Sequence, residues 1–237
     1  MLTIGLEALD FLQLQYKPPF PLDAVITSPI LDKYDRIFLH LLRCFRMQYI
    51  SSQLFRDASS RTSYSQGHNP LNQRFRIEAH HFIVAITSYI FHLCISTNWH
   101  QFEKSLSSLQ NTAATISQIR ELHVSTLDKM LYSCLLKKRQ QPILTLLYAT
   151  FEPILLFAKI SRLYATREQR VWYRMREEME DNTGILYAQF VKRAGMFVRV
   201  VEGLERKEMA RGQEGKEGEG GWFRDLLVRL DGSYFDR

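Results

Sequence analysis

The sequence predicts an all-α protein, a bundle of long helices preceded by an extended, proline-rich N-terminal segment. Apolar residues recur at helical spacing through most of the 237-residue chain. Residues that break helices are scarce, since there are 11 glycines and 7 prolines, and only Gly5 and Gly67 precede residue 182 among the glycines. A composition of 46% apolar and 24% charged residues indicates a globular chain rather than a disordered one.

Residues 1–28 are expected to form an extended segment packed on the helical body. The run Lys17-Pro18-Pro19-Phe20-Pro21 has three prolines in four positions, which forbids a helix there. Ser28 and Pro29 then predict a helix start, with serine as the cap and proline in the first turn. Before the prolines lies a partly alternating apolar run, composed of Leu9, Phe11, Leu12, Leu14 and Tyr16.

Residues 29–204 are the predicted helical body. Asn98 is expected to cap a new, shorter helix, and Lys137-Lys138-Arg139 to place cations at a helix C-terminus. Pro153 falls inside a later helix, which it is expected to kink. The apolar spacing predicts helices over about 29–55, 71–96, 98–109, 114–137, 142–164 and 184–208.

Three segments interrupt this pattern and a fourth follows it. Residues 57–70 are polar and predict a loop. Residues 166–181 are a highly charged insert, either a solvated helical extension or a flexible segment. Residues 205–221 are rich in glycine and glutamate and predict a flexible linker. Residues 222–237 predict a C-terminal helix and tail.

No constellation typical of an enzyme, a metal site or a cofactor site is found in the sequence. It has no glycine-rich phosphate loop and no common hydrolase motif. His80, His81 and His123 are the best candidates for a ligand or a base, but adjacent histidines on a helix point about 100° apart. We therefore expect no catalytic residue, no metal and no cofactor, and a packing role for these histidines.

The cysteines and the hydropathy pattern favour a cytoplasmic protein. Cys44, Cys94 and Cys134 are far apart, lie in apolar helical patterns and form no Cys-x-x-Cys pair, which predicts buried reduced thiols. No signal peptide is evident, and no run of about 18 apolar residues without charge predicts a membrane span.

The chain is basic, with a net charge of +6 and a pI of about 9.2. Its lysines and arginines are scattered among acidic residues rather than gathered in a block with aromatics. An acidic protein partner is therefore favoured, and a helical domain that binds nucleic acid is the less favoured alternative.

Several stretches together resemble the C-terminal γ-tubulin-binding domain of the γ-tubulin complex proteins. The proline-rich stretch is similar to the Pro-Trp-Pro-Leu start of that domain, and Leu226 to Asp231 to its Leu-Leu-x-Arg-Leu-Asp ending. Phe20 replaces the usual tryptophan, Ala79 a methionine and Ala85 a frequent asparagine, which suggests a divergent peripheral component (the fifth or sixth type) of a fungus. The resemblance is carried in order by Leu9 to Leu22, Leu31 to Leu42, Arg76 to Leu106, Leu122 to Leu127 and Leu226 to Asp231.

The resemblance implies a helical module that holds one γ-tubulin and contributes to microtubule nucleation. It implies γ-tubulin and other complex components as partners, and a place in the cytoskeleton at a microtubule-organising centre or spindle pole body. Membrane and nucleic acid are not implied as partners. The family's lateral contacts come mainly from an N-terminal domain that this sequence lacks, so we expect the half that binds γ-tubulin. A helical adaptor for another acidic partner is the rival hypothesis.

Two groups of residues are the candidate contacts with a partner. The first lies in the extended segment and comprises Tyr16, Pro19, Phe20 and Pro21. The alternative for its aromatic residues is that they fix the segment to the core. The second lies near the start of the second long helix and comprises Arg74, Arg76 and His80, for which the alternative is an ordinary solvated helix face.

Overall fold

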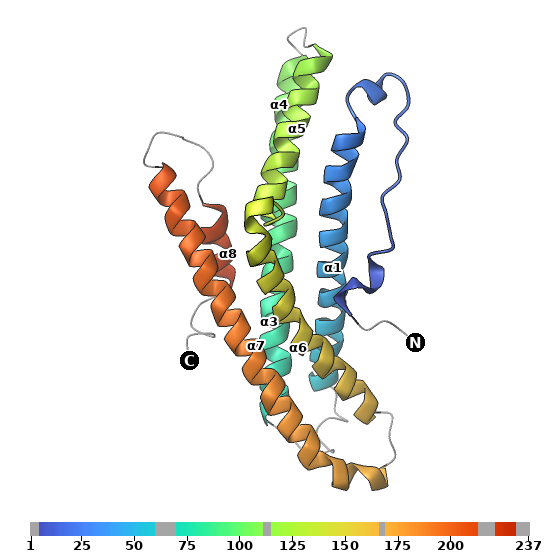
Figure 1. Ribbon diagram of the computed structural model, residues 1–237, viewed down its shortest axis with the longest axis vertical. Coiled ribbons are helices and arrows are strands. Elements are labelled where there is room, and N and C mark those ends of the chain that lie inside the picture. Colours follow the sequence, from blue (N-terminus) through green and yellow to red (C-terminus); the bar gives the residue numbers. More distant parts are fainter. Residues whose placement is uncertain (1–4, 60–69, 111–114, 166–168, 213–220, 231–237) are drawn as a thin grey trace.

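A computed structural model describes residues 5–59, 70–110, 115–165, 169–212 and 221–230. Every regular element within these ranges is helical, which confirms the predicted fold class. The long helices run roughly along one axis and form an elongated bundle, while the segment before the first helix runs up its side (Figure 1).

Several pairs of helices pack against each other in the bundle. α1 and α3 pack together along much of their length, α6 packs on α7, and the short α8 folds back on α7 and α3. The longer elements are α1 (Ser28–Ser59), α3 (Pro70–Ser88), the π-helix η3 (Tyr89–Thr97), α4 (Asn98–Gln110), α5 (Ile116–Ser133), α6 (Gln141–Ala165), α7 (Gln169–Gly212) and α8 (Trp222–Leu230). Short 3-10 turns are η1 (Leu6–Leu9), η2 (Leu22–Ala24) and η4 (Lys138–Gln140).

Buried phenylalanines join α3 to α6 and α7. The ring of Phe75 in α3 lies 4.6 Å from that of Phe157 in α6 and 5.5 Å from that of Phe190 in α7. Two turns further along α3, the ring of Phe82 meets the ring of Phe190 edge-on, with 5.7 Å between ring centres, and that of Phe197 at 6.2 Å. All five side chains are fully buried or nearly so. Rings of this size supply most of the apolar burial at a helix crossing, so this cluster forms the centre of the core.

The second and third predicted helices are one continuous rod. The helical backbone passes from α3 through η3 into α4 without a break, so the prediction that Asn98 begins a new helix is wrong. The wider turn of a π-helix changes which carbonyl groups are paired within the helix. The Asn98 side chain donates a hydrogen bond of 2.7 Å to the carbonyl of Cys94, and the residue is buried inside the rod instead of capping it.

α5 ends four residues before the predicted C-terminus at Lys137. Leu135 has a positive φ of 61°, its N–H donates to the carbonyl of Tyr132, and the N–H of Leu136 donates to that of Leu131. These two bonds form a Schellman motif, which normally has glycine at the positive-φ position. Because the residue at this position is leucine, the local sequence does not indicate that the helix ends here. Lys137 instead forms an ion pair of 2.9 Å with Asp128.

Three of the predicted interruptions are shorter in the structure. Residues 57–59 end α1, and residues 169–181 of the charged insert form the start of α7. α7 continues to Gly212, so residues 205–212 of the predicted linker are helical. Residues 60–69, 166–168 and 213–220, which carry the rest of these predictions, lie outside the described residues, as does the tail at 231–237. The predicted C-terminal helix corresponds to α8.

Two helical stretches, Pro70–Leu109 and Ile116–Arg162, are apolar and long enough to cross a membrane by length and composition. In the most apolar 18 residues of each stretch, half of the residues are buried inside the bundle, which is the burial expected of core helices. All three cysteines, Cys44, Cys94 and Cys134, are also buried in this core, as expected, and unbridged.

A buried polar contact joins α1 to α6. The Nδ1 atom of His40 lies 2.7 Å from the hydroxyl oxygen of Tyr148. Burial, and secondarily the nearby charge of Arg43, lowers the pKa of His40 to about 4. His40 is therefore neutral at pH 7, and the Tyr148 hydroxyl is well suited to donate the hydrogen bond to its ring.

Leu135 offers a test of the αL turn. Leu135→Ala should destabilise the protein by about 2–5 kcal/mol, because a buried leucine side chain is lost. Leu135→Gly loses the same contacts but relieves the left-handed conformation, which costs a non-glycine residue roughly 1–2 kcal/mol. We expect the glycine variant to be the more stable of the two by urea denaturation. An alanine variant that is equally or more stable would contradict the assigned turn.

His40 predicts a pH dependence of stability. The unfolded chain protonates His40 near its ordinary pKa of 6.5, whereas the folded chain does so only near 4. Stability from this group is therefore complete above pH 6.5 and falls by up to about 1.4 kcal/mol per pH unit between 6.5 and 4. His40→Asn should be less stable at pH 7 but should show a shallower decline over this range. Denaturant midpoints measured at several pH values test this, and an unchanged slope would refute it.

Candidate partner-binding surface

Polar contacts attach the segment before α1 to the bundle, in addition to the packing of Leu6 and Ile26 against the core. Asp10 accepts two hydrogen bonds from the guanidinium of Arg43 in α1, of which the bond from Nε to Oδ1 measures 3.0 Å. The carboxylate of Asp35 accepts the main-chain N–H of Leu14 at 3.1 Å. Charged side chains of α1 thus hold the segment along the outside of this helix (Figure 1).

Further arginines fix the two ends of the segment. Arg46 of α1 donates to the carbonyl of Gly5, and Arg120 of α5 donates to the carbonyl of Ala24, with an Nε–O distance of 2.9 Å. Arginine suits this task because its planar group offers several donors in a fixed geometry. The contacts define the path of the main chain without requiring the side chains of the segment to enter the core.

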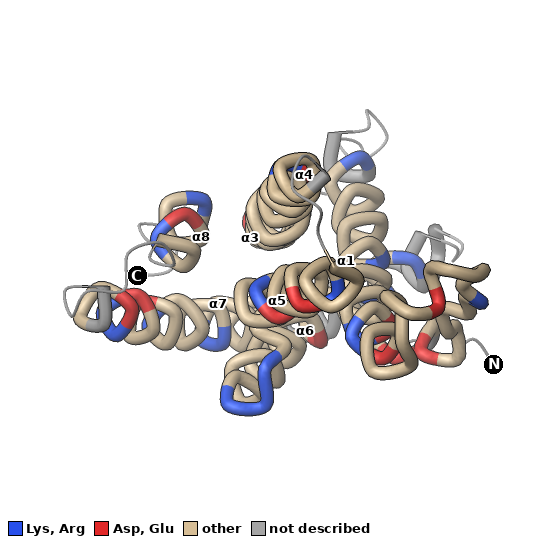
Figure 2. Tube along the Cα trace, turned by 90° about the horizontal axis from the view of Figure 1, so that it is seen from above, with Lys and Arg blue, Asp and Glu red and all other residues tan. Residues whose placement is uncertain are grey.

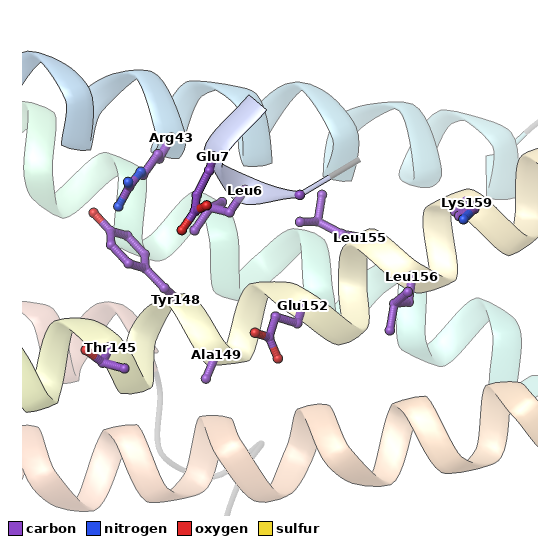
Figure 3. A pocket seen from close by; sticks show the side chains of 11 residues that line it. Leu6, Glu7, Arg43, Thr145, Tyr148, Ala149, Glu152, Leu155, Leu156 and Lys159 are labelled. Carbon is purple, nitrogen blue, oxygen red and sulfur yellow. The ribbon is translucent and has the colours of Figure 1, made fainter. Parts of the chain in front are cut away.

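Arg43 also borders a groove between η1, α1 and α6. Its guanidinium carbon lies 4.9 Å from the ring centre of Tyr148, and Figure 3 shows both side chains beside Glu7 at one end of the groove. Glu152, further along, forms an ion pair of 2.8 Å with Arg193 of α7. The groove has a volume of about 700 Å³ and is lined by Gly5, Leu6, Glu7, Arg43, Thr145, Tyr148, Ala149, Glu152, Leu155, Leu156 and Lys159.

Phe11 and Phe20 of the segment point largely into solvent, and several of its other apolar side chains are partly exposed. Phe20 is 88% exposed and Tyr16 is 47% exposed. The alternative that these rings fix the segment to the core is therefore wrong for Phe20. For Tyr16 it remains open, since about half of that side chain is covered. Pro19 and Pro21 are exposed as well. The four candidate residues of this segment form the end of an exposed apolar ridge, which also includes Phe11, Leu12, Leu14 and Leu22.

The candidate residues of α3 make contacts within the bundle. Arg74 forms an ion pair of 2.8 Å with Glu78 and lies over the ring of Tyr187 in α7. Glu78 is buried and also accepts a hydrogen bond of 2.9 Å from the Tyr187 hydroxyl. Arg76 lies 5.8 Å from the ring centre of Phe157 in α6. The two arginines therefore help to join α3 to its neighbours.

His80 likewise packs against α1. Its ring stacks on that of Phe55 at 4.8 Å, and its Nδ1 atom lies 3.4 Å from the hydroxyl oxygen of Ser51. Burial, and then the neighbouring His81, lowers the pKa of His80. His123 has a comparable role, since its Nε2 atom lies 2.7 Å from the hydroxyl oxygen of Tyr34.

The structure does not bring the two candidate groups together. Phe20 lies shortly before the start of α1, whereas His80 packs on Phe55 near the other end of that helix. The 27 residues between Ser28 and Phe55 span about 40 Å at 1.5 Å per residue. A surface that includes both groups would have to extend over the length of the bundle.

Sequence reasoning missed Phe11 and Leu14 as exposed residues, and Glu78 as a buried carboxylate. The alternation of Leu12, Leu14 and Tyr16 was a usable signal for Leu14, because it is typical of an extended segment and not of a helix, whereas it does not include Phe11. No local signal identified Glu78. Within the described ranges, no group of three or more histidine, cysteine, aspartate or glutamate side chains is arranged to hold a metal ion.

Charged residues of both signs occur along most of the helices (Figure 2). Some of these residues form ion pairs between elements, since Lys33 and Lys137 both pair with Asp128 at about 3 Å. The exposed ridge is thus not distinguished from the rest of the surface by its charge, and exposed apolar side chains also occur on the helices, as at Tyr49, Ile185 and Val228.

Comparisons with known proteins identify a family. The family described as "Gamma tubulin complex component C-terminal" matches residues 1–235. "Gamma-tubulin complex component 6" of Mus musculus is 30% identical over 156 residues, which are 64% of this chain and 8% of that protein. "Gamma-tubulin complex component 3" of Arabidopsis thaliana is 24% identical over 68% of this chain and 20% of its own length.

A yeast protein is also similar. The "Spindle pole body component alp4" of Schizosaccharomyces pombe is 26% identical over 139 residues, 55% of this chain and 17% of that protein. The chain therefore spans no more than about a fifth of the length of these relatives. The family match nevertheless covers nearly every residue, including the exposed ridge and all the helices. The chain belongs to the family of gamma-tubulin complex component C-terminal domains.

Proposed function

We propose that this chain is a γ-tubulin-binding scaffold module of a γ-tubulin complex, which contributes to microtubule nucleation. Its partners are γ-tubulin and other components of the complex, and it acts in the cytoskeleton at a microtubule-organising centre or spindle pole. Membership of the family and the names of its relatives support this function. The module positions a partner and has no catalytic step of its own.

The exposed ridge of the N-terminal segment is the observation that carries the proposal. Phe20 is 88% exposed and Phe11 is 77% exposed, although burying either would favour folding. Large aromatic side chains of this kind dominate the binding energy of many protein interfaces. The segment is also held in place by Asp10, Asp35 and Arg120, so less conformational entropy is lost when a partner binds.

We assign a supporting role to Arg74, Arg76 and His80. Their contacts with Glu78, Phe157 and Phe55 hold α3 against its neighbours. The positive net charge of the whole chain adds long-range attraction to an acidic partner, which affects the rate of association more than the final affinity.

Phe20→Ser tests the assignment of the ridge. We expect binding to purified γ-tubulin to weaken by about 2 kcal/mol, or roughly 30-fold, because an aromatic anchor is lost. Folding should be unaffected because the side chain is almost fully exposed. Tyr16→Ser should weaken binding less, since part of that ring is covered by the chain itself. Affinities can be measured by biolayer interferometry at fixed salt.

Val228→Ser provides the matched control. Val228 is an apolar residue of α8 with 72% exposure, remote in sequence from the ridge. The Val228→Ser variant should bind γ-tubulin like the unmodified chain. No binding by the folded, unmodified chain would refute the proposed function. Equal binding by all variants would place the interface elsewhere, and steeply salt-dependent binding to duplex DNA in its place would support the nucleic-acid alternative.

A further inference from the structure

The main chain of residues 12–17 is largely unpaired. Leu14 donates its N–H to Asp35, but in the described part of the chain the N–H groups of Gln13, Gln15, Tyr16 and Lys17 have no hydrogen-bond partner. The segment runs beside α1 in an extended form and belongs to no helix (Figure 1). It thus has the properties of a β-strand that has no sheet.

The bond to Asp35 determines which edge of the segment faces outward. In an extended chain the N–H groups of successive residues point to opposite edges. Because the N–H of Leu14 points toward Asp35 on α1, those of Gln13, Gln15 and Lys17 point away from α1. Three donors therefore lie along one free edge, spaced about 6.6 Å apart at 3.3 Å per residue. Pro19, the next residue on this edge, ends the row because it has no N–H.

The side chains along the same stretch alternate as in a strand with one apolar face. Leu12, Leu14 and Tyr16 form the apolar face and are 38%, 41% and 47% exposed. Gln13, Gln15 and Lys17 form the polar face. A second strand beside this one would extend the apolar face and cover part of its exposed area.

We infer that residues 12–17 are an unpaired edge strand that binds by main-chain pairing to an exposed sheet edge of the partner protein. This inference rests on the proposed function, because the partner in question is γ-tubulin. A row of regularly spaced outward donors, with carbonyl groups between them, is matched by another extended main chain. A helix has its own main-chain groups paired internally, and a single side chain satisfies only one of the donors.

The charge of the stretch agrees with this mode of binding. Lys17 is the only charged residue between Leu12 and Lys17. Attraction between charges therefore contributes little at this site, and main-chain hydrogen bonds with alternate apolar contacts must supply most of the affinity.

Gln15→Pro in the full chain tests the inference. Proline removes the outward N–H at the centre of the row and remains compatible with an extended backbone, including at the preceding residue. We expect γ-tubulin binding to weaken about tenfold, which corresponds to about 1.4 kcal/mol and to the loss of one main-chain hydrogen bond. Gln15→Ala keeps the N–H and removes the same side chain, so it should bind like the unmodified chain.

Hydrogen exchange provides an independent measurement. The amides of Gln13, Gln15 and Lys17 in the unmodified chain should exchange rapidly alone and become protected when γ-tubulin binds. If the unmodified chain binds but Gln15→Pro binds equally well and exchange stays rapid, the strand inference is wrong while the proposed function survives. If the unmodified chain does not bind γ-tubulin, the proposed function itself fails.

A second copy of this chain is the other possible occupant of the edge. Sedimentation of the chain alone should show a monomer. Concentration-dependent dimers whose amides at residues 12–17 are protected without γ-tubulin would overturn the inference, because the edge would then be occupied by the same segment of another molecule. Dimers that are dispersed by Gln15→Pro and not by Gln15→Ala would lead to the same conclusion.

Discussion

Arg43 is the side chain on which the arrangement of the N-terminal segment depends. It pairs with Asp10 of that segment and lies over Tyr148 of α6, whose hydroxyl is bonded to His40 of α1. The hydrogen bonds that Arg43 donates to the carboxylate of Asp10 raise the pKa of Arg43, and this effect outweighs burial, which lowers it. The Arg43 side chain of α1 thus contacts both the N-terminal segment, through Asp10, and α6, through Tyr148.

This mode of attachment explains why the ridge is exposed. An extended segment on a helical bundle usually inserts its apolar side chains into the core, and each buried phenylalanine contributes about 1.5–3 kcal/mol. Here the attachment is made by Asp10, by the N–H of Leu14 and by the carbonyl of Ala24. These contacts use the main chain or a short polar side chain, so Phe11 and Phe20 remain available for a partner.

The sequence predicted the fold class well because helical periodicity is a local property. Most helices appeared within a few residues of their predicted positions, whereas the failures occurred where the deciding contact was absent from the local pattern. Leu135 ends α5 although nothing but a glycine or asparagine would have signalled it. Asn98 was read as a cap because the π-helical turn that receives its side chain has no sequence signature.

In the candidate site, too, the features that depend on local sequence were predicted and those that depend on helix packing were not. The prolines around Phe20 predicted a non-helical segment and led to the residues that the structure exposes. Arg74 and His80 were predicted as a second contact group because they are polar positions near the second helix, and that pattern does not reveal their neighbours Tyr187 and Phe55. Contacts between residues that are distant in sequence depend on how the helices pack, which a single sequence does not reveal.

An exposed strand edge is ordinarily a hazard, since it offers hydrogen bonds to any other edge. The sequence around residues 12–17 limits this hazard. The free edge has three donors, Lys17 places a charge at its end, and Pro18 and Pro19 prevent its extension. On the other side, Asp35 accepts the hydrogen bond of the Leu14 N–H and thereby blocks pairing from the α1 side.

A short edge with one accessible side favours a partner that also contacts the neighbouring aromatic residues, and Phe11 and Phe20 flank the edge on both ends. The features that discourage aggregation are therefore the same features that would make binding specific.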